Sequence, residues 1–255
     1  MSQNELPLDE LLQAWEQNAA APAHLLGTVS MSDAYLMQLE LLAQRIGGGL
    51  IHTGWKIGQT AAAMRAERGE SEPAPGFMVS INRRENGGAL MLDGQSNWFL
   101  EPELALVLAH DLEGPDVTGE DVRAAVGGVA SAFEIVQRRK GWEDRALQRS
   151  VNGSTAGYVI GPQSEYCPEI GEADDLVVQC TCDGATIAEL RGGSVNDNPI
   201  ETTAWLARFL HRHGHGLRAG QTILTGTYAG LLPVRSGQHW RATIGAFEPV
   251  ILDTK

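Results

Sequence analysis

The sequence of 255 residues predicts an α+β fold, and three observations lead to it. Short apolar or alternating segments that end in turns, which are typical of strands, outnumber the helical patterns. The helical patterns are few and unevenly placed, so they do not alternate with strands as in a doubly wound sheet. A composition of 43% hydrophobic and 20% charged residues is that of a globular protein with a substantial core.

The N-terminal part, residues 1–75, is expected to form a small helical α/β region. Apolar residues at helical spacing predict its first helix, and Ser32 is expected to cap the second, which stops at three glycines. In chain order we expect a helix, a helix, a strand, a helix and a Pro-rich connector over residues 5–20, 33–46, 49–58, 61–69 and 71–77. The boundary to the second domain is placed near residue 75.

Residues 76–255 are expected to form a larger mixed-β body. Its strands are expected over residues 97–112, 130–137, 157–161, 175–184, 185–190, 221–226 and 249–253. Thr118 is expected to cap a helix over residues 118–129. A second helix is expected to begin at Pro199 and to stop at Gly214.

The charge balance excludes several classes of partner. Acidic residues outnumber basic ones by 32 to 19, which gives a net charge of −13 and argues against nucleic acid and against an anionic membrane surface. No apolar run approaches the roughly 18 residues of a membrane span, and the first residues do not resemble a signal peptide. With three cysteines and no Cys-x-x-Cys motif, a cytoplasmic location is expected.

Glu101 and Glu103 are the acidic residues of an otherwise apolar strand segment, residues 99–108. Alternate residues of a strand share a face, so both carboxylates point to the same side as Ala105 and Val107. Two such carboxylates on a buried face repel each other and lose hydration, which costs several kcal/mol per ion. Either one is protonated, or basic residues pair with them, or a divalent cation lies between them.

Glu134 is a third acid embedded in an apolar strand, between Phe133 and Ile135. Three carboxylates without a His or Cys partner favour a hard cation, Mg²⁺ or Mn²⁺, held by Glu101, Glu103 and Glu134. The alternative is that the first two glutamates form ion pairs with basic residues that follow, which are Arg138, Arg139 and Lys140.

Lys56 lies between Trp55 and Ile57 and is bracketed by glycines, an unusual setting for a solvated lysine. Its ammonium group is able to offset the acidic cluster or to position an anionic substrate. The alternative is a surface lysine whose stem covers apolar side chains.

These residues resemble the fumarylacetoacetate hydrolase superfamily, and in particular its 2-oxopent-4-enoate hydratase and 2-oxo-3-hexenedioate decarboxylase branch. The order and spacing of several motifs together carry the resemblance. They are DAYLMQ at 33–38, GWKIGQT at 54–60, EPELALVL at 101–108, FEIVQRR at 133–139, NGSTAGYVIG at 152–161, RGGSVNDNP at 191–199, AWLARFL at 204–210 and ILTG at 223–226.

The resemblance implies roles for individual residues. Glu101, Glu103 and Glu134 would hold Mg²⁺ or Mn²⁺, and Lys56 and Glu101 would act in catalysis. The residues implied to line the substrate pocket are Asn152, Ser154, Thr225 and Gly226. The implied fold is a small N-terminal region with a mixed-β body of the fumarylacetoacetate hydrolase C-terminal type, assembled into a homo-oligomer that is able to associate with a pathway enzyme. Val151, Gln59 and the Thr227–Gly230 turn depart from the family pattern.

The implied activity is hydration of a 2-hydroxy-2,4-dienoate, a 2-oxo or 2-enol carboxylate, to a 4-hydroxy-2-oxo acid in aromatic meta-cleavage catabolism. A cation would stabilise the charge that develops on the 2-oxygen. The alternatives are decarboxylation of a 2-oxo-3-enedioate, for which Arg138, Arg139 and Arg191 offer cations, and a non-catalytic scaffold.

Other motifs are given structural interpretations. The histidines of residues 211–215 lie at a helix end, where they favour the helix dipole rather than zinc. Cys180 and Cys182 share a strand face and are expected to pack in the core. Ser154 does not lie in a Gly-x-Ser-x-Gly motif, which argues against a serine hydrolase.

Overall fold

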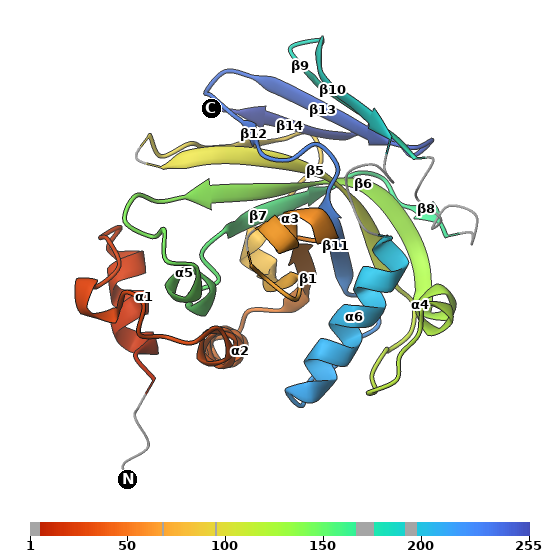
Figure 1. Ribbon diagram of the computed structural model, residues 1–255. Helices are drawn as coiled ribbons and strands as arrows, with labels where there is room; N and C mark the ends of the chain where they lie inside the picture. The colour runs from red at the N-terminus through yellow and green to blue at the C-terminus, as the bar shows by residue number, and fades with distance from the viewer. Residues whose placement is uncertain (1–5, 68, 95, 167–175, 192–197) are drawn as a thin grey trace.

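The structure is a computed structural model that describes residues 6–67, 69–94, 96–166, 176–191 and 198–255. Two sheets lie one above the other, and most helices cover the far side of the larger sheet (Figure 1). The larger sheet contains β1 (His52–Gly58), β2 (Ala74–Val79), β3 (Arg83–Arg84), β5 (Asn97–Leu108), β6 (Val126–Arg138), β7 (Thr155–Ile160), β8 (Ser164–Glu165), β11 (Thr222–Thr227) and β12 (Leu232–Pro233). Its order is β2-β1-β11-β5-β6-β7-β3, with β12 paired to β5 and β8 to β6. The expected α+β class is confirmed.

The smaller sheet has the order β10-β9-β13-β14-β4. Its strands are β4 (Gly88–Leu90), β9 (Val177–Cys182), β10 (Ala185–Arg191), β13 (His239–Ile244) and β14 (Val250–Thr254). The helices are α1 (Leu8–Glu16), α2 (Met31–Gly47), α3 (Ala62–Glu67), α4 (Gly119–Ala125), α5 (Arg145–Ser150) and α6 (Pro199–Arg212), with 3₁₀ turns at Ala23–Leu25 and Ser80–Asn82.

The larger sheet curls, so that its N-terminal strands face β7. The Tyr158 hydroxyl on β7 donates a hydrogen bond of 2.8 Å to the Thr53 hydroxyl on β1. A Cβ atom added to Gly76 on β2 would lie 3.1 Å from Thr155 Oγ1 on β7. Because β11, β5 and β6 separate β1 from β7 in the hydrogen-bonded order, these contacts cross the concave side of the sheet. The inward side chains of β5 and β6 therefore face an enclosed interior.

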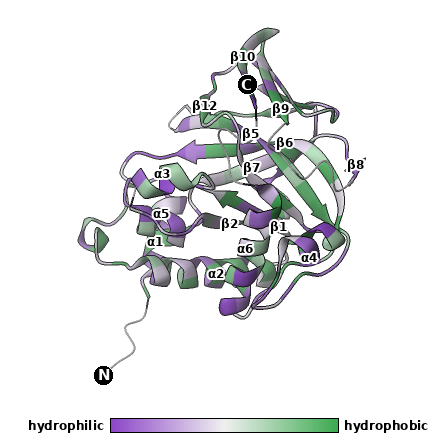
Figure 2. Ribbon diagram, turned by 45° about the vertical axis from the view of Figure 1, so that its right-hand side comes forward, coloured by the Kyte–Doolittle hydropathy of each residue, from purple (hydrophilic) through white to green (hydrophobic). Residues whose placement is uncertain are grey.

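Buried apolar side chains hold the layers together in three groups. The largest joins the helices to the sheet and includes Leu206 and Ile223. A second fills the space between the two sheets, where Phe133 and Trp240 are buried. A third, with Ala105, lies on the inward face of the curled sheet. Figure 2 shows hydrophobic and hydrophilic residues alternating along α2, as expected for a helix with one buried side.

Several helix boundaries expected from the sequence are wrong. The first helix ends at Glu16 rather than near residue 20. The second helix is capped by Ser30 instead of Ser32, because the Ser30 hydroxyl accepts a hydrogen bond from the Asp33 N–H at 3.0 Å. The helix capped by Thr118 ends at Ala125 rather than near residue 129. The residues that follow join β6, where Val126 pairs with Leu108 of the neighbouring strand.

The Pro-rich segment 71–77 is not only a connector, because its last residues belong to β2. Pro75 is tolerated there because β2 is an edge strand that pairs only with β1 in the described part of the chain. The boundary expected near residue 75 falls within this strand, and β1 pairs with β11 from the second region. The division into two domains stays a prediction. Helix α5 and strands β3, β4, β8, β12 and β13 are additions to the expected elements.

Cys180 and Cys182 are buried on β9 with free thiols, as expected for core residues. Cys167 and most of the 191–199 motif lie outside the described residues. Within the described ranges, the structure contains no helix with both the length and the apolar character to cross a membrane.

Candidate active site

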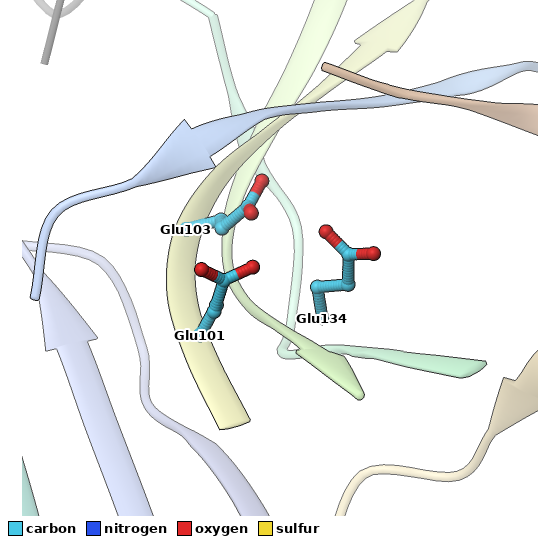
Figure 3. Close-up of side chains that lie close together, drawn as sticks. All are labelled: Glu101, Glu103 and Glu134. Carbon is cyan, nitrogen blue, oxygen red and sulfur yellow. The ribbon is translucent and has the colours of Figure 1, made fainter. Parts of the chain in front are cut away.

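Three glutamates converge on the inward face of the curled sheet (Figure 3). Glu101 and Glu103 project from β5, and Glu134 projects from β6 directly opposite Glu101 in the antiparallel ladder. One carboxylate oxygen of each lies within 4.8 Å of the others. In the described part of the chain this is the one group of three His, Cys, Asp or Glu side chains close enough to hold a metal ion. The sequence-predicted trio is therefore brought together by the fold.

Glu103 is 1% exposed, and burial makes its negative charge unfavourable. Burial, and then the negative charges of Glu134 and Glu101, raise the pKa of the Glu103 carboxyl well above its ordinary value of 4.5. One opposing contact is a hydrogen bond of 2.8 Å from the Gly226 N–H to Glu103 Oε2. Glu103 is thus oriented by the backbone of β11 while its charge is left without full compensation.

Glu134 is 1% exposed as well, and Lys56 is its cationic neighbour. Lys56 Nζ lies 3.4 Å from Glu134 Oε1, and the lysine side chain is 13% exposed. Burial raises the pKa of the Glu134 carboxyl, and Lys56 opposes this shift. Glu134 Oε1 and the neighbouring Thr155 Oγ1 are both buried, and the Thr155 hydroxyl, like Lys56, opposes the rise in the pKa of Glu134. A cluster of three acids with one ammonium group and spare oxygen ligands fits a divalent cation.

Two glycines allow Lys56 to reach the glutamates. Gly76 pairs with Lys56 across β1 and β2, and a Cβ atom there would lie 2.6 Å from Lys56 Cε. Gly54 has a φ of +150°, and a Cβ on it would lie 1.9 Å from the Thr222 carbonyl oxygen on β11. These positions keep β1 close to β11 and leave space for the lysine stem over β2.

A cavity of about 860 Å³ opens over this cluster. Its wall includes Lys56, Glu101 and Glu103, and also the predicted substrate residues Asn152 and Ser154. All five therefore share one space.

Thr225 and Gly226 are not part of the cavity wall that the described residues form. The Thr225 side chain is fully buried, and its hydroxyl donates to the Leu104 carbonyl oxygen at 2.9 Å. Thr227, further along β11, lines the cavity. The role of Thr225 and Gly226 in substrate binding stays a prediction, and both make hydrogen bonds to β5.

Asn152 connects three parts of the wall. It has a φ of +52°, and its side-chain amide donates to the Phe77 carbonyl and accepts from the Phe77 N–H, at 3.0 and 3.2 Å. Its Oδ1 also accepts from Gln38 Nε2 at 3.2 Å. Asn152 therefore ties β2 and α2 to the turn after α5, and its contribution to substrate binding stays a prediction.

The sequence interpretation did not include Gln38, Gly76, Thr155 and Arg149, which all contribute to the site or its wall. Thr155 was within reach, because it lies inside the NGSTAGYVIG motif. Gln38 was likewise within reach, because it is the last residue of the DAYLMQ motif at 33–38. Arg149 is a polar residue of a helix, and no local pattern distinguishes it from a solvent-exposed one.

The alternative interpretation was that the first two glutamates form ion pairs with the basic residues that follow. One of these residues, Arg139, makes its contacts elsewhere. Its guanidinium lies 3.9 Å over the Trp15 ring, donates to the Trp15 carbonyl, and contacts Gln137 Oε1 at 3.2 Å. The cation beside the trio is Lys56.

Comparison with known proteins identifies related sequences. The model of the fumarylacetoacetate (FAA) hydrolase C-terminal family matches residues 76–250. The chain is 32% identical over 220 residues to the 2-hydroxyhexa-2,4-dienoate hydratase of Comamonas testosteroni, covering 85% of this chain and 83% of that protein. It is 31% identical to the 2-hydroxypent-2,4-dienoate hydratase of Pseudomonas putida, covering 83% and 96% of the two chains.

A solved structure shares the whole fold. The 4-oxalocrotonate decarboxylase from Pseudomonas putida G7, complexed with magnesium and adipate, superposes with a TM-score of 0.87 at 23% identity, covering 97% of this chain and 95% of that one. The resemblance inferred from the sequence motifs is confirmed. The chain belongs to the fumarylacetoacetate hydrolase family.

Proposed function

We propose that the protein is a metal-dependent hydratase that adds water to a 2-hydroxy-2,4-dienoate and forms a 4-hydroxy-2-oxo acid. The observation that carries the proposal is the trio Glu101, Glu103 and Glu134 with Lys56 beside it, next to a cavity of about 860 Å³ whose wall includes two of the glutamates and the lysine. Relatives that are about 30% identical over most of the chain are named as hydratases of this substrate class.

The three glutamates would hold the cation, and Mg²⁺ and Mn²⁺ suit this all-oxygen ligand set. A bound cation supplies Lewis-acid stabilisation of negative charge on the substrate's 2-oxygen. Gly226 N–H would keep Glu103 in place, and the Thr155 hydroxyl would keep a polar atom next to Glu134.

Hydration proceeds in two steps, which are ketonisation of the dienol and addition of water to the resulting enone. In the first, the substrate loses the proton of its 2-hydroxyl and gains one at C5, which gives a conjugated 2-oxo-3-enoate. In the second, water contributes hydroxide to C4 and a proton to C3. Lys56 is the residue we assign to proton transfer or to orientation of the C1 carboxylate, because its ammonium lies in the cavity wall 3.4 Å from Glu134.

A second candidate is decarboxylation of a 2-oxo-3-enedioate. It is supported by a 30% identical relative over 85% of this chain, a 4-oxalocrotonate decarboxylase from Pseudomonas sp, and by the basic residues of the cavity wall. In this reaction the bond to the distal carboxylate breaks, CO₂ leaves, and the electron pair passes through the conjugated chain to the 2-oxygen.

Product analysis distinguishes the two reactions. The purified protein would be incubated with Mg²⁺ and either a 2-hydroxy-2,4-dienoate or a 2-oxo-3-enedioate. Formation of a 4-hydroxy-2-oxo acid from the first substrate supports the hydratase. Release of CO₂ from the second without hydration of the first would reverse the order of the two candidates.

Metal binding is tested separately by thermal denaturation. Mg²⁺ or Mn²⁺ should stabilise the protein and EDTA should reverse the effect, because a ligand that binds only the folded state raises its stability. Glu101→Ala and Glu134→Ala should lose the shift. A non-catalytic scaffold would show neither turnover nor a glutamate-dependent shift.

We also propose that the chain forms a homo-oligomer, as the family resemblance implies, and analytical ultracentrifugation would test this. A single sedimenting species at the mass of one chain would contradict it.

A further inference from the structure

The cavity wall is rich in basic residues although the chain as a whole is acidic. Residues 138–149 include five Lys and Arg and two acidic residues, in a chain with a net charge of −13. All five basic side chains line the cavity: Arg138, Arg139, Lys140, Arg145 and Arg149. Such a local excess of positive charge favours a ligand that is anionic at this end of the cavity.

Four of the five cations already have partners. Arg149 contacts the Tyr35 hydroxyl at 2.7 Å and Gln59 Oε1 at 2.8 Å. Arg145 and Arg149 both pair with Glu70. Arg139 is held by Trp15 and Gln137, and Lys140 interacts with the carboxylate of Glu143. These contacts fix the wall and reduce the charge that is available to a ligand.

The Arg138 guanidinium differs from the other four. Its recorded contact is with the ring of Phe99, at 5.6 Å, and the described part of the chain gives it neither a hydrogen bond nor an ion pair. Arg138 is the last residue of β6 and is exposed on the cavity wall. It is therefore the cation best able to accept an anionic group.

Arg138 lies on the same strand face as Glu134. Side chains alternate along a strand, so Glu134, Val136 and Arg138 project to the same side, and Val136 also lines the cavity. The opposite strand repeats the arrangement, since Glu101 pairs with Glu134 and Asn97 pairs with Arg138. Along β6, the acidic cluster at Glu134 is therefore followed by the apolar Val136 side chain and then by the Arg138 guanidinium.

The distance between Glu134 and Arg138 along β6 indicates how long a ligand must be to reach both ends of this wall. Four residues of a strand span about 13 Å between Glu134 and Arg138. The two carboxyl carbons of an extended seven-carbon diacid lie about 7 Å apart, given carbon–carbon bonds of about 1.5 Å. The glutamate side chain, the cation and the long arginine side chain fill the remaining distance. A five-carbon monoacid would end near Val136 and leave Arg138 unused.

We propose that Arg138 is a specificity-determining residue that binds a second carboxylate, so that the preferred substrate is a six- or seven-carbon 2-hydroxy-2,4-dienedioate or its 2-oxo tautomer. This inference rests on the proposed function, in which the C1 carboxylate and 2-oxygen lie at the glutamate cluster. The apolar unsaturated middle of the diacid passes Val136, and its distal carboxylate pairs with the Arg138 guanidinium.

Two substrates of equal length isolate the distal charge. They are 2-hydroxyhepta-2,4-diene-1,7-dioate and 2-hydroxyhepta-2,4-dienoate, which differ in whether C7 is a carboxylate or a methyl group. The wild-type protein should prefer the diacid by about tenfold in kcat/KM, mainly through KM, as expected for a charge-assisted hydrogen bond at a partly solvated site. The preference should decrease as salt increases.

Arg138→Met removes the charge and keeps an apolar contact with Phe99, so it should reduce the diacid preference to about one. Arg138→Lys should retain part of the preference. Arg235→Met, which removes an exposed arginine that does not line the cavity, is the matched control and should leave the ratio unchanged. Equal kcat/KM values in the wild type, or a ratio that Arg138→Met does not change, would overturn the proposal.

A binding measurement separates this inference from the proposed function. The saturated analogues 2-oxoheptanedioate and 2-oxoheptanoate would be titrated into the Mg²⁺-loaded protein by calorimetry. If neither dienoate is turned over, the hydratase assignment fails. Tighter binding of the diacid that depends on Arg138 would still support the inference, and equal binding of both analogues would refute it.

Discussion

The two faces of the β5–β6 pair show how differently one piece of sheet is used. The outward face carries Leu100, Phe133 and Ile135, which pack against the smaller sheet and its Trp240. The buried Ser131 hydroxyl on this face has a hydrogen-bond partner, because it accepts from the Ile244 N–H at 3.1 Å. This face is built like an ordinary core between two sheets.

The inward face carries ionisable side chains that are as little exposed to solvent as the apolar side chains of the outward face. These side chains are Glu103 and Glu134, and in the described part of the chain Lys56 is the one cation that forms an ion pair with Glu134. Burial of such groups opposes folding, whereas burial of the outward face favours it. The comparison indicates that the outward face supplies stability and the inward face supplies function. Four experiments test that division.

The largest effect is expected for Glu103→Gln on the inward face. The amide keeps the shape of the side chain and an oxygen that can accept from Gly226 N–H, but it removes one of the three negative charges. Turnover should decrease by about 10⁴-fold, as expected when a metal ligand is lost, while the metal-free protein should be at least as stable as the wild type. Steady-state kinetics and urea denaturation in EDTA measure the two quantities. An active variant would remove Glu103 from the metal ligands.

Phe133→Ala on the outward face should have the opposite profile. Removing a fully buried ring leaves a cavity between the sheets and should reduce the free energy of unfolding by about 3 kcal/mol. The folded fraction should still bind Mg²⁺, so the metal-induced shift in melting temperature should persist. Loss of the metal response with little loss of stability would contradict the division between the two faces.

Gly76→Ala should have an intermediate effect on activity. The added Cβ would meet Lys56 Cε at 2.6 Å, and the flexible lysine stem is able to move while the backbone stays in place. We therefore expect turnover to fall about tenfold to a hundredfold through misplacement of the ammonium, with about 1 kcal/mol of stability lost. Gly47→Ala, with no atom within 4 Å of the new Cβ, is the control. A purely structural role for Gly76 would lower stability and leave turnover per folded molecule unchanged.

The smallest effect is expected in the dependence of stability on pH. The pKa values of Glu103 and Glu134 are raised above 4.5, so the folded state retains protons that the unfolded chain releases. Their contribution to stability is full below pH 4.5 and is lost as the pH rises through the folded-state pKa values.

In EDTA, a Glu103→Gln/Glu134→Gln double variant should therefore gain stability relative to the wild type as pH increases from 4.5 to about 8. Mg²⁺ affinity of the wild type should increase with pH, by up to about tenfold per unit for each proton displaced. Thermal denaturation and metal titration across this range check both expectations. A metal affinity that is constant over the range would indicate that the glutamates are already ionised in the metal-free protein.

Local patterns predicted most elements that have strong periodicity or clear end signals. The long strands β5 and β6 and helix α6, with Pro199 at its first position and Gly214 beyond its end, follow directly from the residues. Strand β2 was not predicted, because a segment that contains Pro75 is typical of a connector. A proline is compatible with a strand here because β2 lies at the edge of the sheet. The extension of β6 back to Val126 depends on pairing with β5, which local sequence does not contain.

The candidate site was predictable to a similar extent. Acids at alternate positions of β5, and a third on β6, are visible in the sequence because an acid in an apolar strand needs compensation. That Glu101 faces Glu134 depends on the register between the strands. Among the residues that the structure describes, Arg138 is the one of five clustered cations without a hydrogen bond or ion pair, and this depends on which neighbours the fold gives to the other four.

The sequence by itself determined the chemistry that is available: three oxygen-donor side chains in apolar strands and a lysine between glycines. Only the tertiary structure decided that these groups meet. In a flat sheet, the three strand spacings from β1 to β6 would place Lys56 about 14 Å from Glu134. Curling of the sheet brings Nζ and Oε1 to 3.4 Å, because the inward face is concave and the glycines at positions 54 and 76 leave space for close approach.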